Sequence, residues 1–305
     1  SPEHGDSVNN LLAAADAAMY EAKRNKDTPV FYYTNEIGQR NRAYYKLSSN
    51  LKSAVFNRNL HLVFQPIVNS YSGKIEGYEA LTRWEFEDNF VDSDIIISMI
   101  ERIGLSKSFF IWLIETALAE SASFLNSEQF ISINVTVRQF LSEDFLAVIV
   151  DAISKHENTT ISLEITESSI FADYEKAVAT ICQLKKLGIK VMIDDFGTGY
   201  SSLGRLKDLD IDKIKIDKSF LVDSELNARS RKIFQSILGL ATTLDIEVVA
   251  EGLETAEQFN FLRQFPPMLV QGYLLQEPTV KELLKSQSTL NKAMNNKWDF
   301  SKYYG

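Results

Sequence analysis

Seven short apolar runs of this chain each end at a polar residue, and these residues are Glu79, Asn134, Glu164, Asp194, Lys215, Glu251 and Gln271. Runs of this length that are rich in Val, Ile and Leu are typical of buried strands. A closed barrel of parallel strands with one polar mouth would place a polar group at the same end of strand after strand. The pattern therefore predicts a water-accessible site rich in carboxylates, which needs cations to balance its charge.

From residue 129 onward, strand-like and helix-like segments alternate, which is the signature of parallel α/β structure. The expected strands of this part are 129–135, 160–166, 189–195, 211–217, 246–252 and 268–273. Earlier, 60–68 and 74–84 form a hairpin around the turn SYSG, which makes one strand antiparallel. The expected helices are 34–58, 94–103, 107–124, 143–155, 174–187, 229–244, 254–263 and 279–288, with a short one after the loop FGTGYSS. We therefore predict the α/β class, with a modified TIM (β/α)8 barrel that contains one antiparallel strand.

Charge and histidine content exclude several kinds of site. Lys and Arg number 32 against 41 Asp and Glu, a net charge of −9 that argues against binding a DNA or RNA polymer. The three histidines, His4, His61 and His156, have no partner at helical spacing, so neither a histidine zinc site nor a Ser-His-Asp triad is expected. Any metal would be held by oxygen ligands, which suits Mg²⁺, Mn²⁺ or Ca²⁺.

Asp194 and Asp195 are adjacent acids at a predicted strand end, followed by Gly197 and Gly199. Neighbouring residues on a strand face opposite sides, so both carboxylates can reach one ion only where the chain turns. The two glycines permit such a turn. The pair suits two bridged divalent ions, and the alternative is a loop acid pair satisfied by backbone N–H groups at the following helix start.

Glu164 alternates with Leu163 and Ile165 and would face the barrel interior, where a carboxylate is costly unless it is neutralised. Glu167 follows the strand end, which favours a role in anchoring a loop. Asn134 can supply an oxygen ligand, or it can cap a turn.

Glu79 and Arg83 would share one face of their strand, which suits a metal beside an anionic substrate. The alternative is a plain ion pair between the two. Gln65 precedes Pro66, which places it at an edge or bulge with a hydrogen-bonding role.

Lys215 lies between two apolar residues, and a lysine in such a position is rarely left unpaired. Glu251 and Gln271 stand at two further strand exits. This set of oxygen donors predicts two Mg²⁺ or Mn²⁺ ions that activate a water for in-line attack on a phosphodiester. Lys215 and Arg83 would stabilise the developing charge.

Seven segments resemble, in order, the motifs of EAL-domain cyclic-di-GMP phosphodiesterases: EALTRW, SINVT, SLEITES, MIDDFGTGYSSL, DKIKID, AEGLET and QGYLLQEP. The resemblance runs from about residue 42 to residue 287. It implies a modified TIM barrel with one antiparallel strand and hydrolysis of cyclic di-GMP to linear pGpG with Mg²⁺ or Mn²⁺. It also implies a first metal on Glu79, Asn134, Glu164 and Asp194, and a second on Asp194, Asp195 and Glu251.

The resemblance implies further roles. Lys215 would contact the attacking water or the scissile phosphate, and Gln271 would orient the water or a group in the outer shell of the metals. Gln65, Arg83 and Pro278 would position the substrate. Glu167 would stabilise the loop 196–203, which couples the site to a dimer interface in the family. Whether Glu251, Asp195 or Lys215 acts as the base is left open.

Residues 1–34, through LLAAADAAMYEAKRNKDTPVFYY, resemble the last helix and strand of a GGDEF domain without its glycine-rich loop. We therefore expect a GGDEF remnant at 1–34, a connecting helix at 35–52, the barrel at 53–288 and a polar tail at 289–305. The expected partners are a second copy of the chain, bound through the barrel, and the missing GGDEF or sensory region. The single Cys182 fits a reducing cytoplasmic setting, and no apolar run reaches the roughly eighteen residues that span a membrane.

Two other functions remain open from the sequence. One is a catalytically weak receptor for cyclic di-GMP, although receptor-type relatives typically lack some metal ligands and this chain lacks none. The other is a different TIM-barrel metalloenzyme that stabilises an enolate with Mg²⁺.

Overall fold

A computed structural model of the protein describes residues 30, 32–57, 59–156, 159–197, 203–222 and 228–286, with separate positions between 7 and 19. The predicted GGDEF-like helix and strand fall largely outside the described residues, and the polar tail falls wholly outside them. Among the helices that are described, none combines the length and hydropathy needed to cross a bilayer.

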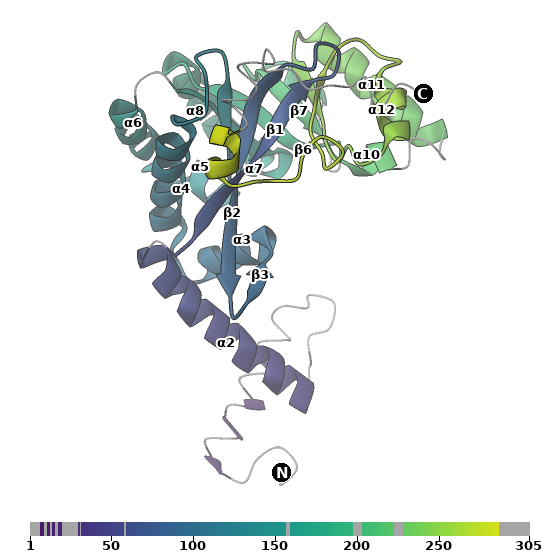
Figure 1. The fold of residues 1–305 in the computed structure, drawn as a ribbon. Coiled ribbons are helices and arrows are strands. Elements are labelled where there is room, and N and C mark those ends of the chain that lie inside the picture. Colours follow the sequence, from purple (N-terminus) through teal and green to yellow (C-terminus); the bar gives the residue numbers. More distant parts are fainter. Residues whose placement is uncertain are drawn as a thin grey trace.

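Eight strands close into a barrel, in which each strand pairs with a neighbour on both sides (Figure 1). In order around the ring they are β1 (His61–Asn69), β9 (Leu269–Val270), β8 (Glu247–Ala250), β7 (Lys213–Ile216), β6 (Lys190–Phe196), β5 (Thr160–Thr166), β4 (Phe130–Val135) and β2 (Ile75–Phe86). β1 runs antiparallel to both neighbours, and the other pairs of the ring are parallel. The predicted barrel with one antiparallel strand is confirmed.

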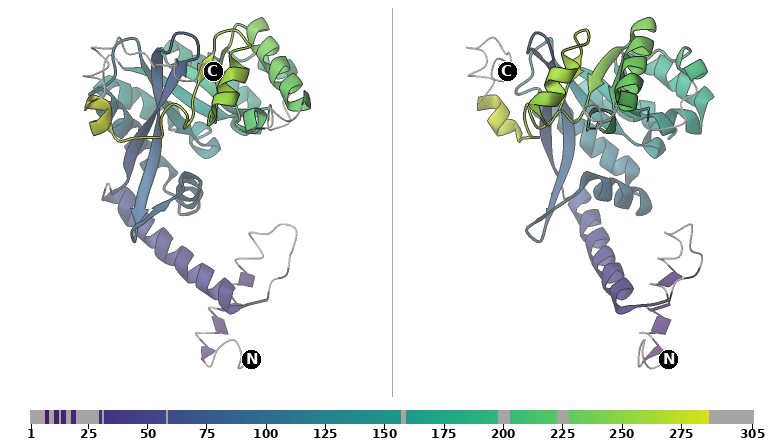
Figure 2. Two further views of the ribbon diagram at one scale, coloured as in Figure 1. Left: turned by 45° about the vertical axis from the view of Figure 1, so that its right-hand side comes forward. Right: turned by 90° about the vertical axis from the view of Figure 1, so that its right-hand side faces the viewer.

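Helices lie around the outside of the barrel and extend beyond it (Figure 1). They are α2 (Asn35–Phe56), α3 (Ser93–Arg102), α4 (Ser106–Ser121), α5 (Val137–Phe140), α6 (Phe145–Lys155), α7 (Glu167–Ala172), α8 (Tyr174–Lys186), α9 (Leu203–Leu206), α10 (Ser219–Val222), α11 (Ala228–Thr243) and α12 (Ala256–Leu262). Residues 281–286 are also helical. Both views of Figure 2 show that α2 extends away from the barrel.

The sequence reasoning missed α5, α7, α10 and the strand β3 (Asn89–Val91), which pairs with the outer end of β2. Segments of three to six residues are too short to show a periodic pattern. A capping signal was available for α5, because the Thr136 side chain and the Gln139 side chain each bond the other residue's backbone N–H.

Apolar side chains fill the lower interior of the barrel. Ile67, Phe130, Met192, Val249 and Leu269 form a buried cluster separate from the main core between barrel and helices. A Cβ on Gly77 would lie 2.7 Å from the carbonyl oxygen of Phe130 and 2.8 Å from its ring, so glycine makes room for this ring. Since the lower interior is packed, polar chemistry is confined to the other end of the strands.

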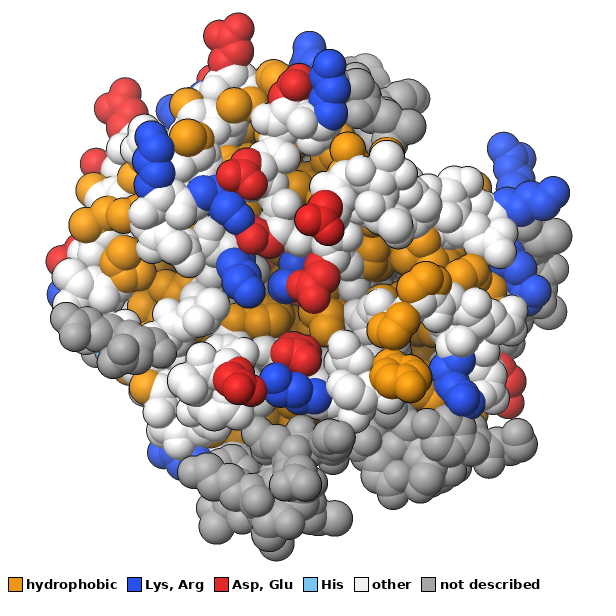
Figure 3. Space-filling view, turned by 90° about the horizontal axis from the view of Figure 1, so that it is seen from above, with side chains coloured by type: hydrophobic (Ala, Val, Ile, Leu, Met, Phe, Trp, Pro, Cys, Tyr) orange, Lys and Arg blue, Asp and Glu red, His pale blue; other side chains and the backbone are white. Residues whose placement is uncertain are grey.

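Charged side chains where the parallel strands begin are mostly paired. Lys74 pairs with Glu128 at 2.9 Å, Lys185 pairs with Asp212 at 2.6 Å, and Lys213 pairs with Glu247. Figure 3 looks down on the molecule and shows acidic and basic side chains interspersed near the middle of that face. Because acidic and basic side chains alternate here, this part of the face has no uniform charge that would attract an oppositely charged partner.

Candidate functional site

The polar residues at the ends of the apolar runs come together inside the barrel mouth. In register, Gln65 of β1 lies opposite Glu79 of β2, and Asn134 of β4 lies beside Glu164 of β5. We expected Glu79 at a strand end. It lies within β2 instead, because β2 continues beyond the barrel to pair with β3. The last pairing of β2 with β4 is at Ala80, so Glu79 still stands at the rim.

Lys215 lies at the centre of this group, and its side chain is 2% exposed. Its Nζ is 2.5 Å from Glu164 Oε2 and 3.3 Å from Glu79 Oε2. It lies 3.7 Å from Asp194 Oδ1 and also forms an ion pair with Glu251 Oε1. The expectation that this lysine is not left unpaired is confirmed.

Amides complete the contacts of Glu79. Asn134 Nδ2 and Gln271 Nε2 each donate to its carboxylate at 2.6 Å. Gln271 Nε2 also donates to Gln65 Oε1 at 3.0 Å, and Gln65 Nε2 donates to the carbonyl of Gln276 at 3.2 Å. These bonds connect β1, β2, β4 and the exit of β9 around one carboxylate.

Gln65 precedes a proline that the sequence placed at an edge or bulge. The backbone of Phe64 bonds Thr279 on the side of β1 that faces away from β2. The backbone nitrogen of Pro66 faces the same side. On that side β1 pairs with β9 only at Val68 and Asn69, so the missing N–H of the proline costs the sheet no hydrogen bond. Gln65 itself pairs in regular register with Glu79, and the register shift follows only between Ile67 and Val68, so the irregularity lies beyond the predicted position.

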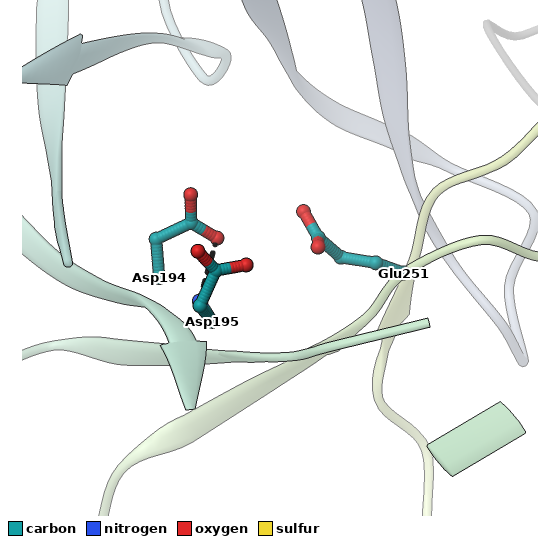
Figure 4. Close-up of side chains that lie close together, drawn as sticks. All are labelled: Asp194, Asp195 and Glu251. Carbon is teal, nitrogen blue, oxygen red and sulfur yellow. Dashed lines mark hydrogen bonds between the residues drawn. The ribbon is translucent and has the colours of Figure 1, made fainter. Parts of the chain in front are cut away.

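Asp194, Asp195 and Glu251 form a second group in which one oxygen of each lies within 4.8 Å of the others (Figure 4). The backbone turns at Asp195, whose φ is 54°, and at Gly197, whose φ is 95°. The Asp195 N–H donates to Asp194 Oδ1 at 2.9 Å. The predicted turn is thus confirmed, while Gly199 lies outside the described residues.

Neighbouring charges raise the pKa of Lys215 and lower the pKa of Glu79. Burial by itself lowers the pKa of Lys215, but the surrounding carboxylates, with Glu164 foremost, raise it well above its ordinary value. Burial by itself raises the pKa of Glu79. The Lys215 charge and the bonds from Gln271 and Asn134 outweigh burial and lower that pKa.

Three further carboxyl groups of the site, those of Glu164, Glu251 and Asp195, have a raised pKa. Burial, followed by the charge of Glu79, raises the pKa of Glu164 well above its ordinary value. Burial raises the pKa of Glu251 to about 7 against the opposing effect of Lys215. Burial and the charge of Asp194 raise the pKa of Asp195. Because one ammonium does not satisfy so many carboxylates, the site favours additional positive charge.

The available atoms fit hard divalent cations. Glu164 Oε1 and Gln271 Oε1 are buried and have no hydrogen-bond partner within the described part of the chain. Asn134 and Gln271 contact Glu79 through nitrogen, which leaves their carbonyl oxygens available. Carboxylate and amide oxygens are the ligands that Mg²⁺ and Mn²⁺ prefer.

Three other predicted residues lie elsewhere. Arg83 donates to Ser93 Oγ and to the carbonyl of Thr82, both at 2.9 Å, and no ion pair with Glu79 is found among the described side chains. Glu167 begins α7 and is buried, but residues 198–202 of the loop that it was expected to stabilise lie outside the description. Pro278 is half-buried and precedes Thr279, whose backbone pairs with Phe64.

Two cavities adjoin the acids, and both are lined by Glu79, Leu81 and Glu251. The larger, of about 1120 Å³, extends toward α3 and α5 and is also lined by Asp94, Ser98, Glu101 and Arg138. The smaller, of about 300 Å³, is lined by Gln65, Gln271, Lys218, Glu254 and Tyr273. Sequence reasoning missed Asp94, Glu101, Arg138, Lys218, Glu254 and Tyr273, because nothing in their local patterns distinguishes them from solvated surface residues.

Comparisons with known proteins agree with this geometry. A sequence profile described as EAL domain matches residues 48–278. The cyclic di-GMP phosphodiesterase PdeR of Escherichia coli (strain K12) is 32% identical over 283 residues, which cover 91% of this chain and 43% of PdeR. An uncharacterized signaling protein of Caulobacter vibrioides is 32% identical over 291 residues, which cover 94% of this chain and 36% of that protein.

A solved structure described as the PaMucR phosphodiesterase in complex with c-di-GMP superposes with a TM-score of 0.75 at 31% identity. The match covers 78% of this chain and 99% of that chain. The present chain spans about two fifths of the length of the two curated relatives, 36% and 43%.

Proposed function

The chain belongs to the EAL domain family, and on that basis we propose that it is a metal-dependent phosphodiesterase that hydrolyses cyclic di-GMP to linear pGpG. The observation that carries the proposal is the convergence of Glu79, Glu164, Asp194 and Glu251 within 4.0 Å of one ammonium, that of Lys215. A site that concentrates oxygen donors so closely suits a substrate that is bound through metals and phosphate.

Two Mg²⁺ or Mn²⁺ ions are the cofactors that this donor set would hold. Glu79, Asn134, Glu164 and Asp194 would bind one, and Asp194, Asp195 and Glu251 would bind the other. The second assignment is supported by the 4.8 Å cluster of the three carboxylates. Such ions, when bound, make a water more acidic and neutralise charge on a phosphate.

Side chains of the protein would orient the water, stabilise the charge on the phosphate and accept the proton. Attack by the oxygen of a water on phosphorus, in line with the leaving 3′ oxygen, breaks one P–O bond and opens the ring. Lys215 would donate a hydrogen bond to a phosphate oxygen that gains negative charge. Gln271, which is held by Glu79 and Gln65, would orient the water through its unpaired carbonyl oxygen. Asp195 or Glu251 would receive the proton that the attacking water loses, and the leaving 3′ oxygen would take up a proton from the solvent.

The two cavities suit the two nucleotide arms of the substrate, because they meet at the acids where the scissile phosphate would lie. The larger cavity carries Arg138 and Glu101, which can donate to and accept from the edge of a base. The smaller carries the Tyr273 ring, which is 59% exposed and can stack on a purine. Gln65 and Pro278 would position the substrate near β1, and Arg83 would act through Ser93.

Product analysis after incubation with cyclic di-GMP tests the proposal. Linear pGpG is expected with Mg²⁺ or Mn²⁺ and not with excess chelator. Glu79→Gln and Asp194→Asn should lower turnover by at least about 100-fold while the circular dichroism spectrum stays unchanged.

Glu76→Gln is the matched control, since Glu76 lies on the same strand but pairs with Lys74 at the other end of the barrel. It should retain full turnover. Binding of cyclic di-GMP with no linear product under any metal condition would replace the enzyme by a receptor.

We also propose that the domain acts in the cytoplasm as a homodimer joined to a GGDEF or sensory region, as the family resemblance implies. In this proposal Glu167 orders the loop 196–203, which couples the site to the dimer interface. Light scattering of the purified chain tests the dimer, and a monomer at all protein concentrations would contradict it.

A further inference from the structure

Two serine hydroxyls lie inside the barrel directly beneath the carboxylates and contribute to no role described above. Ser132 of β4 and Ser162 of β5 are paired in register, and both have no exposed surface. Neither Oγ has a hydrogen-bond partner among the residues that the structure describes. The same is true of Glu164 Oε1, which belongs to a residue two positions after Ser162 on the same face of β5.

These three atoms complement one another. A buried hydroxyl is costly without a partner, and it can both donate and accept. Glu164 binds Lys215 through Oε2, and Oε1 has two lone pairs, so it can accept a hydrogen bond as well as face a metal. The apolar side chains of Phe130 and Met192, which belong to the cluster below, offer no polar group.

The distance between residues along β5 limits what can connect the Ser162 hydroxyl with the Glu164 carboxylate. Ser162 and Glu164 are two residues apart on one face of β5, about 6.6 Å along the backbone, so their side chains are neighbours that one water, bonding each at about 2.8 Å, can bridge. Ser132 contributes a second hydroxyl from the neighbouring strand. A buried water typically makes about three hydrogen bonds to polar groups that otherwise lack partners.

We propose that Ser132, Ser162 and Glu164 form a binding site for one buried water, which holds the Glu164 carboxylate in the orientation that meets Lys215. The two serines are positioning residues, since they touch neither substrate nor the reacting atoms. The inference rests on the proposed function only for its metal-binding and kinetic readouts. The water site itself is tested independently of any activity.

The sign of the change in melting temperature separates this proposal from the alternative of two unpaired hydroxyls. If the water is present, Ser132→Ala and Ser162→Ala each remove one of its partners and should lower Tm by roughly 2–6 °C. If the hydroxyls are unpaired, the same substitutions remove a buried polar group and should raise Tm. Ser106→Ala is the matched control, because Ser106 Oγ is also buried and unpartnered in the described chain but lies in α4, away from the site.

Two further measurements report on position. The affinity for Mn²⁺, measured by electron paramagnetic resonance without nucleotide, should fall about 10-fold in Ser162→Ala and not in Ser106→Ala. With cyclic di-GMP, kcat should fall while KM stays unchanged. A high-resolution crystal structure should show density for a water within hydrogen-bond distance of both Oγ atoms.

A rise in Tm in both barrel variants, or a crystal structure without that density, would overturn the proposal. A chain that proves unable to hydrolyse cyclic di-GMP would contradict the proposed function but leave these two tests in force. The two inferences therefore fail on different observations.

Discussion

At the scale of single residues, Lys215 connects carboxylates that reach it from four parts of the barrel. Glu79 is 136 residues away in sequence and Glu164 is 51 residues away, yet both bind the same ammonium. One ammonium does not balance four carboxylates. The excess charge is relieved either by protonation, as the raised pKa of Glu164 indicates, or by further cations.

Removal of this ammonium should therefore be costly. Lys215→Met leaves Glu79 and Glu164 buried with no cation, and we expect the free energy of unfolding to fall by about 3–5 kcal/mol, with loss of phosphodiesterase activity. Urea denaturation in the presence of chelator measures the change. Lys281→Met is the control, since Lys281 pairs with Glu120 and is 30% exposed, and it should cost less than about 1 kcal/mol. Equal losses of unfolding free energy in the two variants would contradict the prediction, because the buried ion pairs of Lys215 would then contribute no more than an exposed pair.

At the scale of elements, β2 serves both the site and the outer core. Its inward face carries Glu79 to the rim, and its outward face carries Tyr78 against Phe124, with ring centroids 5.2 Å apart and planes at 80°. Phe124 in turn packs on Phe64 of β1 with centroids 5.0 Å apart. The aromatic contacts hold the β1–β2 hairpin against the end of α4, so the position of Glu79 depends on a strand that is packed on both faces.

Tyr78 gives this packing a measurable pH dependence. Burial raises the pKa of Tyr78 to about 12 from an ordinary value of 10.0. The raised folded pKa means that the folded state favours the neutral phenol, so its contribution is complete below about pH 10 and is lost as pH rises toward about 12. The free energy of unfolding of the native chain should fall over this window by roughly 2–3 kcal/mol more than that of Tyr78→Phe. Urea unfolding of both proteins across the window measures the difference, and parallel curves would refute the assignment.

At the scale of the whole molecule, the concentrated acid site and the net charge of −9 predict that bound cations stabilise the folded state. A ligand that binds only the folded state stabilises it by about 2.7 kcal/mol at 100 times its dissociation constant. We therefore expect Mg²⁺ or Mn²⁺ to raise Tm by several degrees, which thermal scanning with and without chelator measures.

The source of this stabilisation can be located by substitution. In Glu251→Gln the increase in Tm should be much smaller, because one of the three clustered carboxylates is lost. In Glu76→Gln it should be unchanged. If Glu251→Gln kept the full metal-induced increase, the cations would be acting elsewhere on the acidic surface.

The barrel, its antiparallel strand and the polar residues of its mouth could be predicted from the amino-acid sequence. The evidence for them is local, because the length of a strand, the alternation of its apolar and polar residues and the residue at its end can all be read from consecutive residues. The short helix α5 was also within reach, through the Thr136 to Gln139 capping signal.

The contacts among these residues could not be predicted in this way, because they depend on the folded barrel. Closure of the ring places Lys215 among acids from β2, β5, β6 and the exit of β8, and Arg83 contacts Ser93 rather than Glu79. The same closure puts Tyr273 and Arg138 on cavities and leaves Ser132 beside Ser162 beneath the carboxylates. Distances between residues on separate strands depend on register and packing across the whole barrel, and no local pattern of residues contains that information.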